Sequence, residues 1–269
     1  LPGYSEAASA HDDFPPAEML LGAADNPLDN LSARDEDLRD AVISPPSSAQ
    51  IVAGLRSAEP ARRLTAIHAL AGARRRISAV SYLTNVLLNY AETPKIRTAA
   101  AVTLGRIGDM RGAEPLAAAL NDPAAEVRYA AALSLGRVPA DGAATRLSRT
   151  LRAAPSWWVR YAAAIALGRT GKSFVAGALK DRLLLEPQWQ VRLQVVRSLQ
   201  DIGGARAAEA VALALRDADA GVRTAAALAL AEIGSDSQLP PLHRALNAET
   251  DHSARSVLSQ TYRRVLSKP

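Results

Sequence analysis

The chain has 269 residues, of which 48% are hydrophobic and only 4% aromatic, and its formal net charge is +5. The complete absence of Cys excludes disulfides, thiolate metal sites, iron–sulfur clusters and a Cys nucleophile. The core must be built mainly from Ala and Leu, which favour helices over strands, so we expect an all-α fold. No uncharged apolar run reaches the roughly 18 residues that a transmembrane helix needs.

Charge is divided unevenly along the chain. Residues 1–44 carry ten acidic and two basic residues, a net charge of −8, whereas the remaining residues carry +13. Residues 1–32 have no hydrophobic period and are rich in Pro, Gly and Asp, which predicts an extended acidic arm. Charges act over about 8–10 Å near physiological salt, so the arm and the basic body should attract each other. The start at Leu1, with no initiator methionine, favours a processed, exported chain over a cytoplasmic one.

A repeat of 31 to 32 residues follows the arm. An apolar residue and an Arg recur as Ile96-Arg97, Val127-Arg128, Val159-Arg160, Val191-Arg192 and Val222-Arg223. Leu stands seven residues after each of these arginines, and Leu or Val stands 19 residues and Leu 23 residues after them. The Leu seven residues after the Arg fits the same helix as the Arg. The residues at 19 and 23 are four apart, which fits the buried stripe of a second helix. Such hairpins bury their apolar faces only by stacking on one another.

In chain order, the pattern predicts the acidic arm over 1–32 and then a solenoid over 33–269. The solenoid should begin with a capping repeat over 33–57, with helices at 35–43 and 48–57. Repeats over 58–250 follow, and a terminal half-repeat over 251–269 ends the chain. The expected fold is a right-handed α-solenoid, an α-α superhelix of about six to seven helical hairpins.

The residues of one repeat carry a family resemblance. Val159–Gly171 reads Val-Arg-x-x-Ala-Ala-x-x-Leu-Gly-x-x-Gly, and Val127–Gly136 nearly repeats it. This pattern resembles the HEAT-like repeats of the phycobilisome-lyase type, over roughly residues 48–266. The resemblance implies the solenoid fold, but such repeats occur in scaffolds, lyase subunits and adaptors alike. The repeat that begins at Arg192 departs from the pattern at residues 193–197 and at Gln200, so we expect looser packing or a local curvature there.

The sequence contains no catalytic motif in the structural context that its chemistry requires. Ala166–Ser173 fits a permissive phosphate-loop pattern, but that chemistry needs a preceding strand, and the repeat places a helix there. The four histidines form none of the spacings of zinc proteases, and no G-x-S-x-G elbow is present. We therefore expect a protein that is not an enzyme, with no catalytic residue, no metal site and no cofactor.

Two surface features of the repeats could bind a partner. The first is a basic strip nine residues after successive motif arginines, formed by Arg106, Arg137 and Arg169. Its alternative is that these cations only complement helix dipoles. The second is an apolar patch with a basic rim on the second helices, formed by Leu184, Leu185, Leu213, Arg149, Arg152 and Arg216. Its alternative is that the leucines pack under the next turn.

Two further features lie outside these helix faces. Three tryptophans stand just before first helices, namely Trp157, Trp158 and Trp189. They could be binding hot spots, or could pack under the turns between repeats. In the arm, Phe14–Leu21 contains Phe14, Met19, Leu20 and Leu21 after a Pro pair. This segment could dock on a protein or could be a featureless linker.

The sequence therefore favours a non-catalytic scaffold that binds protein partners within a multi-subunit complex, through the concave solenoid face and the arm. The resemblance implies one alternative, an accessory subunit of a bilin lyase-like enzyme. A HEAT-like nucleic-acid-binding protein is the second alternative, supported by the basic body but opposed by interspersed acids and by the arm. We expect no membrane span.

Overall fold

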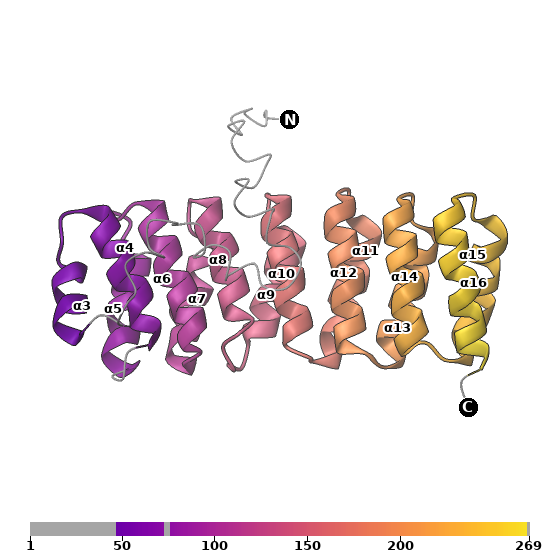
Figure 1. The fold of residues 1–269 in the computed structure, drawn as a ribbon, viewed down its shortest axis with the longest axis horizontal. Coiled ribbons are helices and arrows are strands. Elements are labelled where there is room, and N and C mark those ends of the chain that lie inside the picture. Colours follow the sequence, from indigo (N-terminus) through magenta and orange to yellow (C-terminus); the bar gives the residue numbers. More distant parts are fainter. Residues whose placement is uncertain (1–46, 73–75, 268–269) are drawn as a thin grey trace, which may run out of the picture. The chain divides into compact units, whose positions relative to one another are not determined.

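The computed structural model describes residues 47–72 and 76–267, which form helices joined by short turns (Figure 1). No strand occurs in these two ranges, so the all-α fold expected from the composition is confirmed. None of the helices found there is both long and apolar enough to cross a membrane. The arm expected over 1–32 and the helix expected at 35–43 lie outside the described residues.

The chain divides into two compact units, Leu1–Pro139 with Pro155–Val159, and Ala140–Ala154 with Arg160–Pro269. The helices of the N-terminal unit are α3 (Ser48–Leu55), α4 (Pro60–Ala69), α5 (Arg76–Leu88), α6 (Pro94–Ile107), α7 (Ala113–Ala119) and α8 (Ala125–Leu135). Those of the C-terminal unit are α9 (Ala143–Ala153), most of α10 (Trp157–Arg169), α11 (Ala176–Leu185), α12 (Trp189–Ile202), α13 (Gly204–Leu213), α14 (Ala220–Ile233), α15 (Leu239–Ala248) and α16 (His252–Leu266). Helix α3 matches the second capping helix expected at 48–57.

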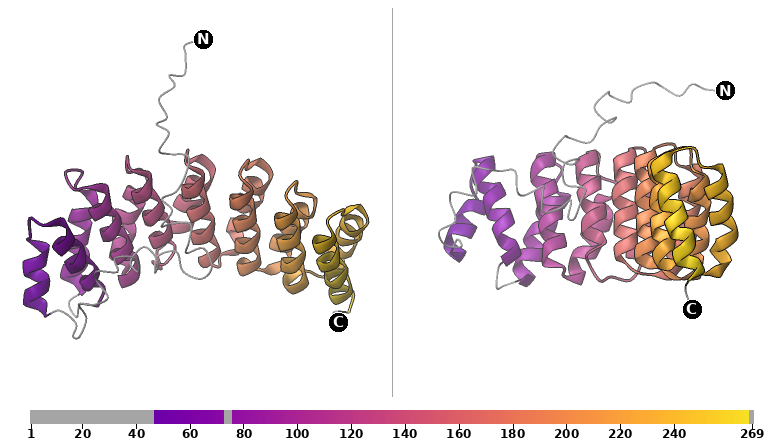
Figure 2. Two further views of the ribbon diagram at one scale, coloured as in Figure 1. Left: turned by 45° about the horizontal axis from the view of Figure 1, so that its top comes forward. Right: turned by 45° about the vertical axis from the view of Figure 1, so that its right-hand side comes forward.

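Within each unit the helices form two layers. In the N-terminal unit the first helices α4, α6 and α8 pack successively against one another, and the second helix α5 packs beside α7. In the C-terminal unit α12, α14 and α16 form the layer of first helices, and α11 and α13 lie side by side in the other layer (Figures 1 and 2). This is the stacking of helical hairpins that the repeat predicts.

The repeated leucines and alanines build the core. Leu104, Leu135, Leu167, Leu199 and Leu230, which stand seven residues after the motif arginines, are all buried. Leu116, Leu147, Leu179 and Leu242 on the second helices have no exposed surface. The Ala runs of the first helices are equally buried, which lets neighbouring first helices approach closely.

The repeat that begins at Arg192 packs as fully as the others. Val195, Val196 and Leu199 have no exposed surface, so larger side chains fill the space that Ala occupies elsewhere. Gln194 donates a hydrogen bond to the Ser198 hydroxyl, which donates in turn to the Ala164 carbonyl of the preceding first helix. The looser packing expected from the altered sequence is therefore not observed in this region.

The motif arginines form a ladder of ion pairs within the repeats. Four of the five pair with an acid near the end of the second helix of their own repeat, 25 or 26 residues later, in Arg97–Asp122, Arg160–Glu186, Arg192–Asp217 and Arg223–Glu249. Their closest N–O distances are 2.7–2.8 Å, and the acidic side chains are almost completely buried. The same acids accept hydrogen bonds from backbone amides that lead into the next first helix. The motif arginines therefore connect the two helices of a repeat and fix the turn to the next one.

Hydrogen bonding stabilises the charged form of two of the ladder acids, Glu186 and Glu249. The hydrogen bonds from Arg223 outweigh burial and lower the pKa of Glu249 to about 2. Burial alone would raise the pKa of Glu186, but the hydrogen bonds from Arg160 and Arg182 and from the Gln188 amide outweigh it and lower the pKa. Both carboxylates are therefore ionised at neutral pH.

Glycine permits close approaches between helices in both units. A Cβ atom on Gly105 would lie 2.6 Å from the Ser134 Cβ and 2.8 Å from its Cα, far inside van der Waals contact. A Cβ atom on Gly168 would meet Ser198 at 2.9 Å. Both glycines stand eight residues after a motif arginine, and each lets two successive first helices approach closely.

Replacing Gly105 by Ala should lower the free energy of unfolding by about 1–3 kcal/mol, because the backbone of α8 must move away. Gly177, at the exposed start of α11, is the matched control, since a Cβ there meets nothing within 4 Å. Gly177→Ala should leave stability unchanged or raise it slightly. Urea unfolding of the two variants measures the difference, and equal midpoints for both would contradict the close approach.

Candidate partner-binding surface

The second helices of the C-terminal unit each bury one face. On α9, α11 and α13 the residues that face the first-helix layer are spaced four apart, as Leu147 and Leu151, Leu179 and Leu183, and Val211 and Leu215. Leu215 lies in the 3-10 turn that continues α13. Because successive residues of an α-helix are rotated by about 100°, a side chain two positions away from this stripe points away from the first-helix layer.

Large apolar side chains occupy that outward face. The exposed fractions of Leu184 and Leu185, at the end of α11, are 61% and 74%, and that of Leu213 on α13 is 41%. The leucines therefore do not pack under the next turn, which was the alternative left open by the sequence. Leu184 and Leu185 are adjacent on α11, and Leu213 lies on α13, which packs beside α11, so exposed apolar side chains gather on this layer in the way that marks many protein interfaces.

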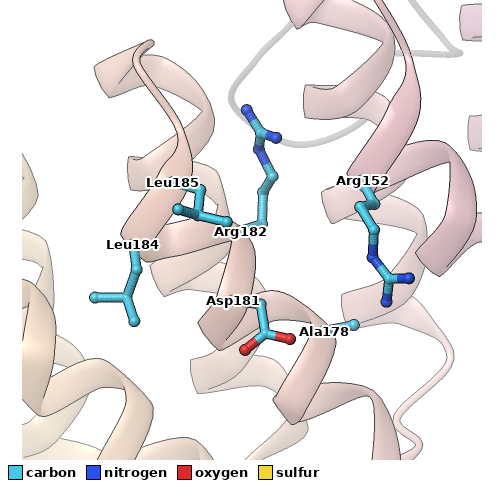
Figure 3. A pocket seen from close by; sticks show the side chains of 6 residues that line it. All are labelled: Arg152, Ala178, Asp181, Arg182, Leu184 and Leu185. Atoms are coloured by element: carbon cyan, nitrogen blue, oxygen red, sulfur yellow. The ribbon is translucent and has the colours of Figure 1, made fainter.

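A shallow groove of about 300 Å³ adjoins the two leucines of α11. It is lined by Arg152, Ala178, Asp181, Arg182, Leu184 and Leu185. Figure 3 shows Leu184, Leu185 and Asp181 on α11, with Arg152 extending from the facing helix toward Ala178. The Arg182 Nε atom donates to the Glu186 carboxylate at 2.6 Å, which holds this side chain at the edge of the groove.

Basic side chains lie around the apolar patch, together with the exposed acids Asp181 and Glu209. Arg149 and Arg152 on α9 and Arg216 after α13 are exposed, and none of the three has an acidic partner among the described residues. A guanidinium stays charged at all physiological pH values. We call Leu184, Leu185, Leu213, Arg149, Arg152 and Arg216 the apolar–basic surface.

The HEAT-repeat family model matches residues 48–125, 113–192 and 176–263, which together cover most of the chain. The chain belongs to the HEAT-repeat family. This confirms the resemblance drawn from the Val-Arg and Leu-Gly pattern. No curated protein matches the sequence significantly.

Two solved structures resemble this HEAT-repeat protein in fold. A chain of the complex of CpcE and CpcF of phycocyanin lyase from Nostoc sp. is 20% identical, with a TM-score of 0.52, and the match covers 84% of this chain and 97% of that one. The Escherichia coli protein YibA is 17% identical, with a TM-score of 0.58, over 93% of this chain and 90% of that one. At these identities the similarity establishes the α-solenoid type of fold alone.

The tryptophans of this HEAT-repeat protein differ in exposure. Trp158 is 3% exposed and its ring packs against Tyr129, with ring centroids 5.4 Å apart. The hypothesis of a binding hot spot therefore does not hold for Trp158, whose apolar ring is buried in the core instead. Trp157 is half-buried, and Trp189, at the start of α12, is 45% exposed. Of the three tryptophans, Trp189 is the most exposed.

The three arginines of the expected basic strip are not free cations. Arg106 and Arg137 are half-buried and Arg169 is exposed, and each has an interaction partner within the protein. The positive charge of Arg169 acts on Asp201, although burial has the larger effect and raises the pKa of that carboxyl group. These interactions leave the three arginines less available to a partner than the basic strip requires.

The phosphate-loop pattern lies in a turn between helices. Ala166–Arg169 ends α10, Gly171 has a φ of +59°, and Ser173–Val175 forms a 3-10 turn. A helix precedes the turn where phosphate binding would need a strand, so the interpretation as a repeat turn is confirmed. No group of three or more potential metal ligands occurs in the described part of the chain.

Two residues of the groove were not predicted from the sequence, and four predicted residues lie outside the described part of the chain. Arg182 and Ala178 line the groove but were not singled out, although the i, i+4 spacing of Arg182 and Glu186 could have indicated an ion pair. Phe14, Met19, Leu20 and Leu21 of the expected docking segment lie outside the described residues.

Proposed function

We propose that this HEAT-repeat protein is a non-catalytic scaffold or accessory subunit that binds a protein partner through the apolar–basic surface. The observation that carries this function is the exposure of Leu184 and Leu185 beside arginines that have no internal acidic partner. An apolar centre with a polar rim is the usual anatomy of a protein interface. Arg is also among the residues that contribute most to binding energy.

Membership of a multi-subunit complex is supported by the extent of this face. A stable interface buries about 800 Å² on each partner, which a small groove cannot supply but a row of adjacent second helices can. The fold similarity to a chain from a two-component phycocyanin lyase supports the variant in which the protein is an accessory subunit of a bilin lyase-like enzyme.

Nucleic-acid binding is the second alternative, and the ladder argues against it. Arg97, Arg160, Arg192 and Arg223 are engaged by buried or half-buried carboxylates, so the excess of basic residues overstates the charge available for phosphate. Acidic Asp181 and Glu209 are also exposed on the second helices of the C-terminal unit.

Salt dependence of binding separates these functions. With the full chain as bait, a protein bound through the apolar–basic surface should remain bound between about 50 and 200 mM salt. Binding through six or more phosphate contacts would weaken by about 10³-fold over that range. If the protein is instead an accessory subunit of a bilin lyase-like enzyme, mixing it with a tetrapyrrole should change the visible absorption of the tetrapyrrole. Loss of all captured proteins at the higher salt concentration would contradict the scaffold.

A further inference from the structure

Arg128 is the motif arginine that has no ladder acid in its own repeat. The residue 26 positions later is Ala154. The Arg128 Nη1 atom nevertheless donates to the Asp122 and Pro123 carbonyls, just as the Nη1 atoms of the other four motif arginines donate to carbonyls five or six residues before them. In those four repeats the same orientation directs Nε and Nη2 at a carboxylate. The guanidinium of Arg128 is therefore anchored as if to bind an acid.

Buried hydrogen-bond donors gather around Arg128. Its Nε atom, the Ser156 hydroxyl and the Trp158 indole Nε1 atom are all buried, and none has a hydrogen-bond partner among the described residues. Ser156 and Trp158 are 5% and 3% exposed, and the Trp158 ring lies against Tyr129, the residue that follows Arg128. All of these residues belong to the N-terminal unit. Because folded proteins rarely leave buried polar groups unpaired, the donors point to a ligand.

Ser156 stands where the other repeats complete the environment of their acid. Two residues after each ladder acid a backbone amide donates to that acid, as the Gln188 amide does to Glu186. Ser156 is two residues after Ala154, which gives it the same position. It directly precedes the 13-residue helix α10, whose N-terminus favours an anion. We call Arg128, Ser156 and the start of α10 the Arg128 site.

Two acidic residues lie close to this site in the chain, and neither pairs with Arg128 in the described part of the protein. Asp122 binds Arg97 through both carboxylate oxygens and also accepts a hydrogen bond from the Ala124 amide. Its negative charge is therefore offset. Glu126 is half-buried two positions before Arg128 on α8, and side chains at this spacing do not face each other. The Arg128 cation is therefore available to an anion from outside the chain.

We propose that the Arg128 site binds one carboxylate group from outside the chain, held by the guanidinium of Arg128 and the hydroxyl of Ser156. Carboxylate is the expected class of anion because the four other motif arginines each hold one in the same orientation. A planar guanidinium also matches a carboxylate through two parallel N–H groups. The group can belong to a small organic acid or to an acidic side chain of another protein. The site lies in the N-terminal unit and does not depend on the apolar–basic surface.

Unfolding of the full chain by urea in two sodium salts tests this site. Sodium acetate supplies the carboxylate, and sodium chloride at the same concentration is the reference. A ligand that binds only the folded protein lowers the unfolding equilibrium constant in proportion to the ratio of its concentration to its dissociation constant. We expect about 100 mM acetate to lower this constant at least about threefold relative to chloride in the natural protein.

Three variants assign the acetate effect to a place in the molecule. Arg128→Met removes the cation of the site, and the effect should vanish. Ser156→Ala should reduce it. Arg56→Met is the matched control, since it removes an exposed arginine of the same unit and should keep the full effect. Equal stability of the natural protein in the two salts, or an undiminished acetate effect in Arg128→Met, would overturn the proposal.

Two blocked tripeptides distinguish the sources of the carboxylate. The first is acetyl-Ala-Glu-Ala-amide, and the second carries Gln in place of Glu. If acetate and the Glu peptide stabilise the natural protein but the Gln peptide does not, an acidic side chain of another protein reaches the site. If acetate alone stabilises it, the site takes a small organic acid. Both results support the carboxylate site, whereas equal stabilisation by the Glu and Gln peptides with none by acetate would contradict it.

Discussion

Replacing Arg97 by Met should lower the free energy of unfolding by about 3–5 kcal/mol, because it leaves a buried carboxylate without its cation. The Arg97 Nε and Nη2 atoms donate to the two oxygens of Asp122 at 2.9 and 2.8 Å. The two side chains are 4% and 1% exposed, so water cannot replace the lost hydrogen bonds. Met has a similar length and preserves most of the apolar packing.

Arg128 offers a matched control in the next repeat. It occupies the same motif position, but the residue 26 positions later is Ala154, and its Nε atom is buried without a hydrogen-bond partner. Its Nη1 atom still donates to the carbonyls of Asp122 and Pro123. Arg128→Met should therefore cost only about 1–2 kcal/mol.

Urea unfolding of the two variants compares the two motif arginines. The double variant Arg97→Met with Asp122→Asn should recover part of the stability that the single variant loses, because the buried charge is removed as well. Equal destabilisation by Arg97→Met and Arg128→Met would show that the ion pair contributes nothing beyond the backbone contacts.

The repeat columns predicted the fold because each column reports burial. Leu104 and its counterparts belong to the buried face of the first helices. Leu116 and its counterparts belong to the buried face of the second helices. All of them are buried, as the repeat predicts. The ladder could not be predicted from the motif arginines alone. The partner of Arg97 is 25 residues away, and only the path of the turn after the second helix brings Asp122 to it.

The candidate surface was only partly predictable for a related reason. Whether Leu184 and Leu185 point outward depends on how far α11 is rotated in its layer, which the spacing of Leu179 and Leu183 fixes only approximately. The adjacent Trp157 and Trp158 show the same limitation, since one is half-buried and the other packs on Tyr129. Neighbouring residues of identical type were separated only by the packing of the helices around them.

Replacing Leu185 by Asp should weaken binding of the protein partner by at least about 30-fold. Loss of one hot-spot residue costs about 2 kcal/mol or more, and here a charge is also placed on the apolar part of the interface. Because Leu185 is 74% exposed, the substitution should change the stability of the free protein by no more than about 0.5 kcal/mol.

Leu228 provides the matched control for this substitution. It is 53% exposed on α14, in the layer of first helices, and it does not line the groove. Leu228→Asp introduces the same charge into the same unit at a comparable exposure. Any effect that both variants share therefore comes from the added charge or from folding, not from the apolar–basic surface.

The dissociation constant of the partner captured by the full chain, measured by calorimetry for the two variants and the natural protein, tests the use of this surface most directly. We predict a dissociation constant at least about 30 times higher for Leu185→Asp and an unchanged one for Leu228→Asp. Identical dissociation constants for all three proteins would contradict binding through the exposed second helices.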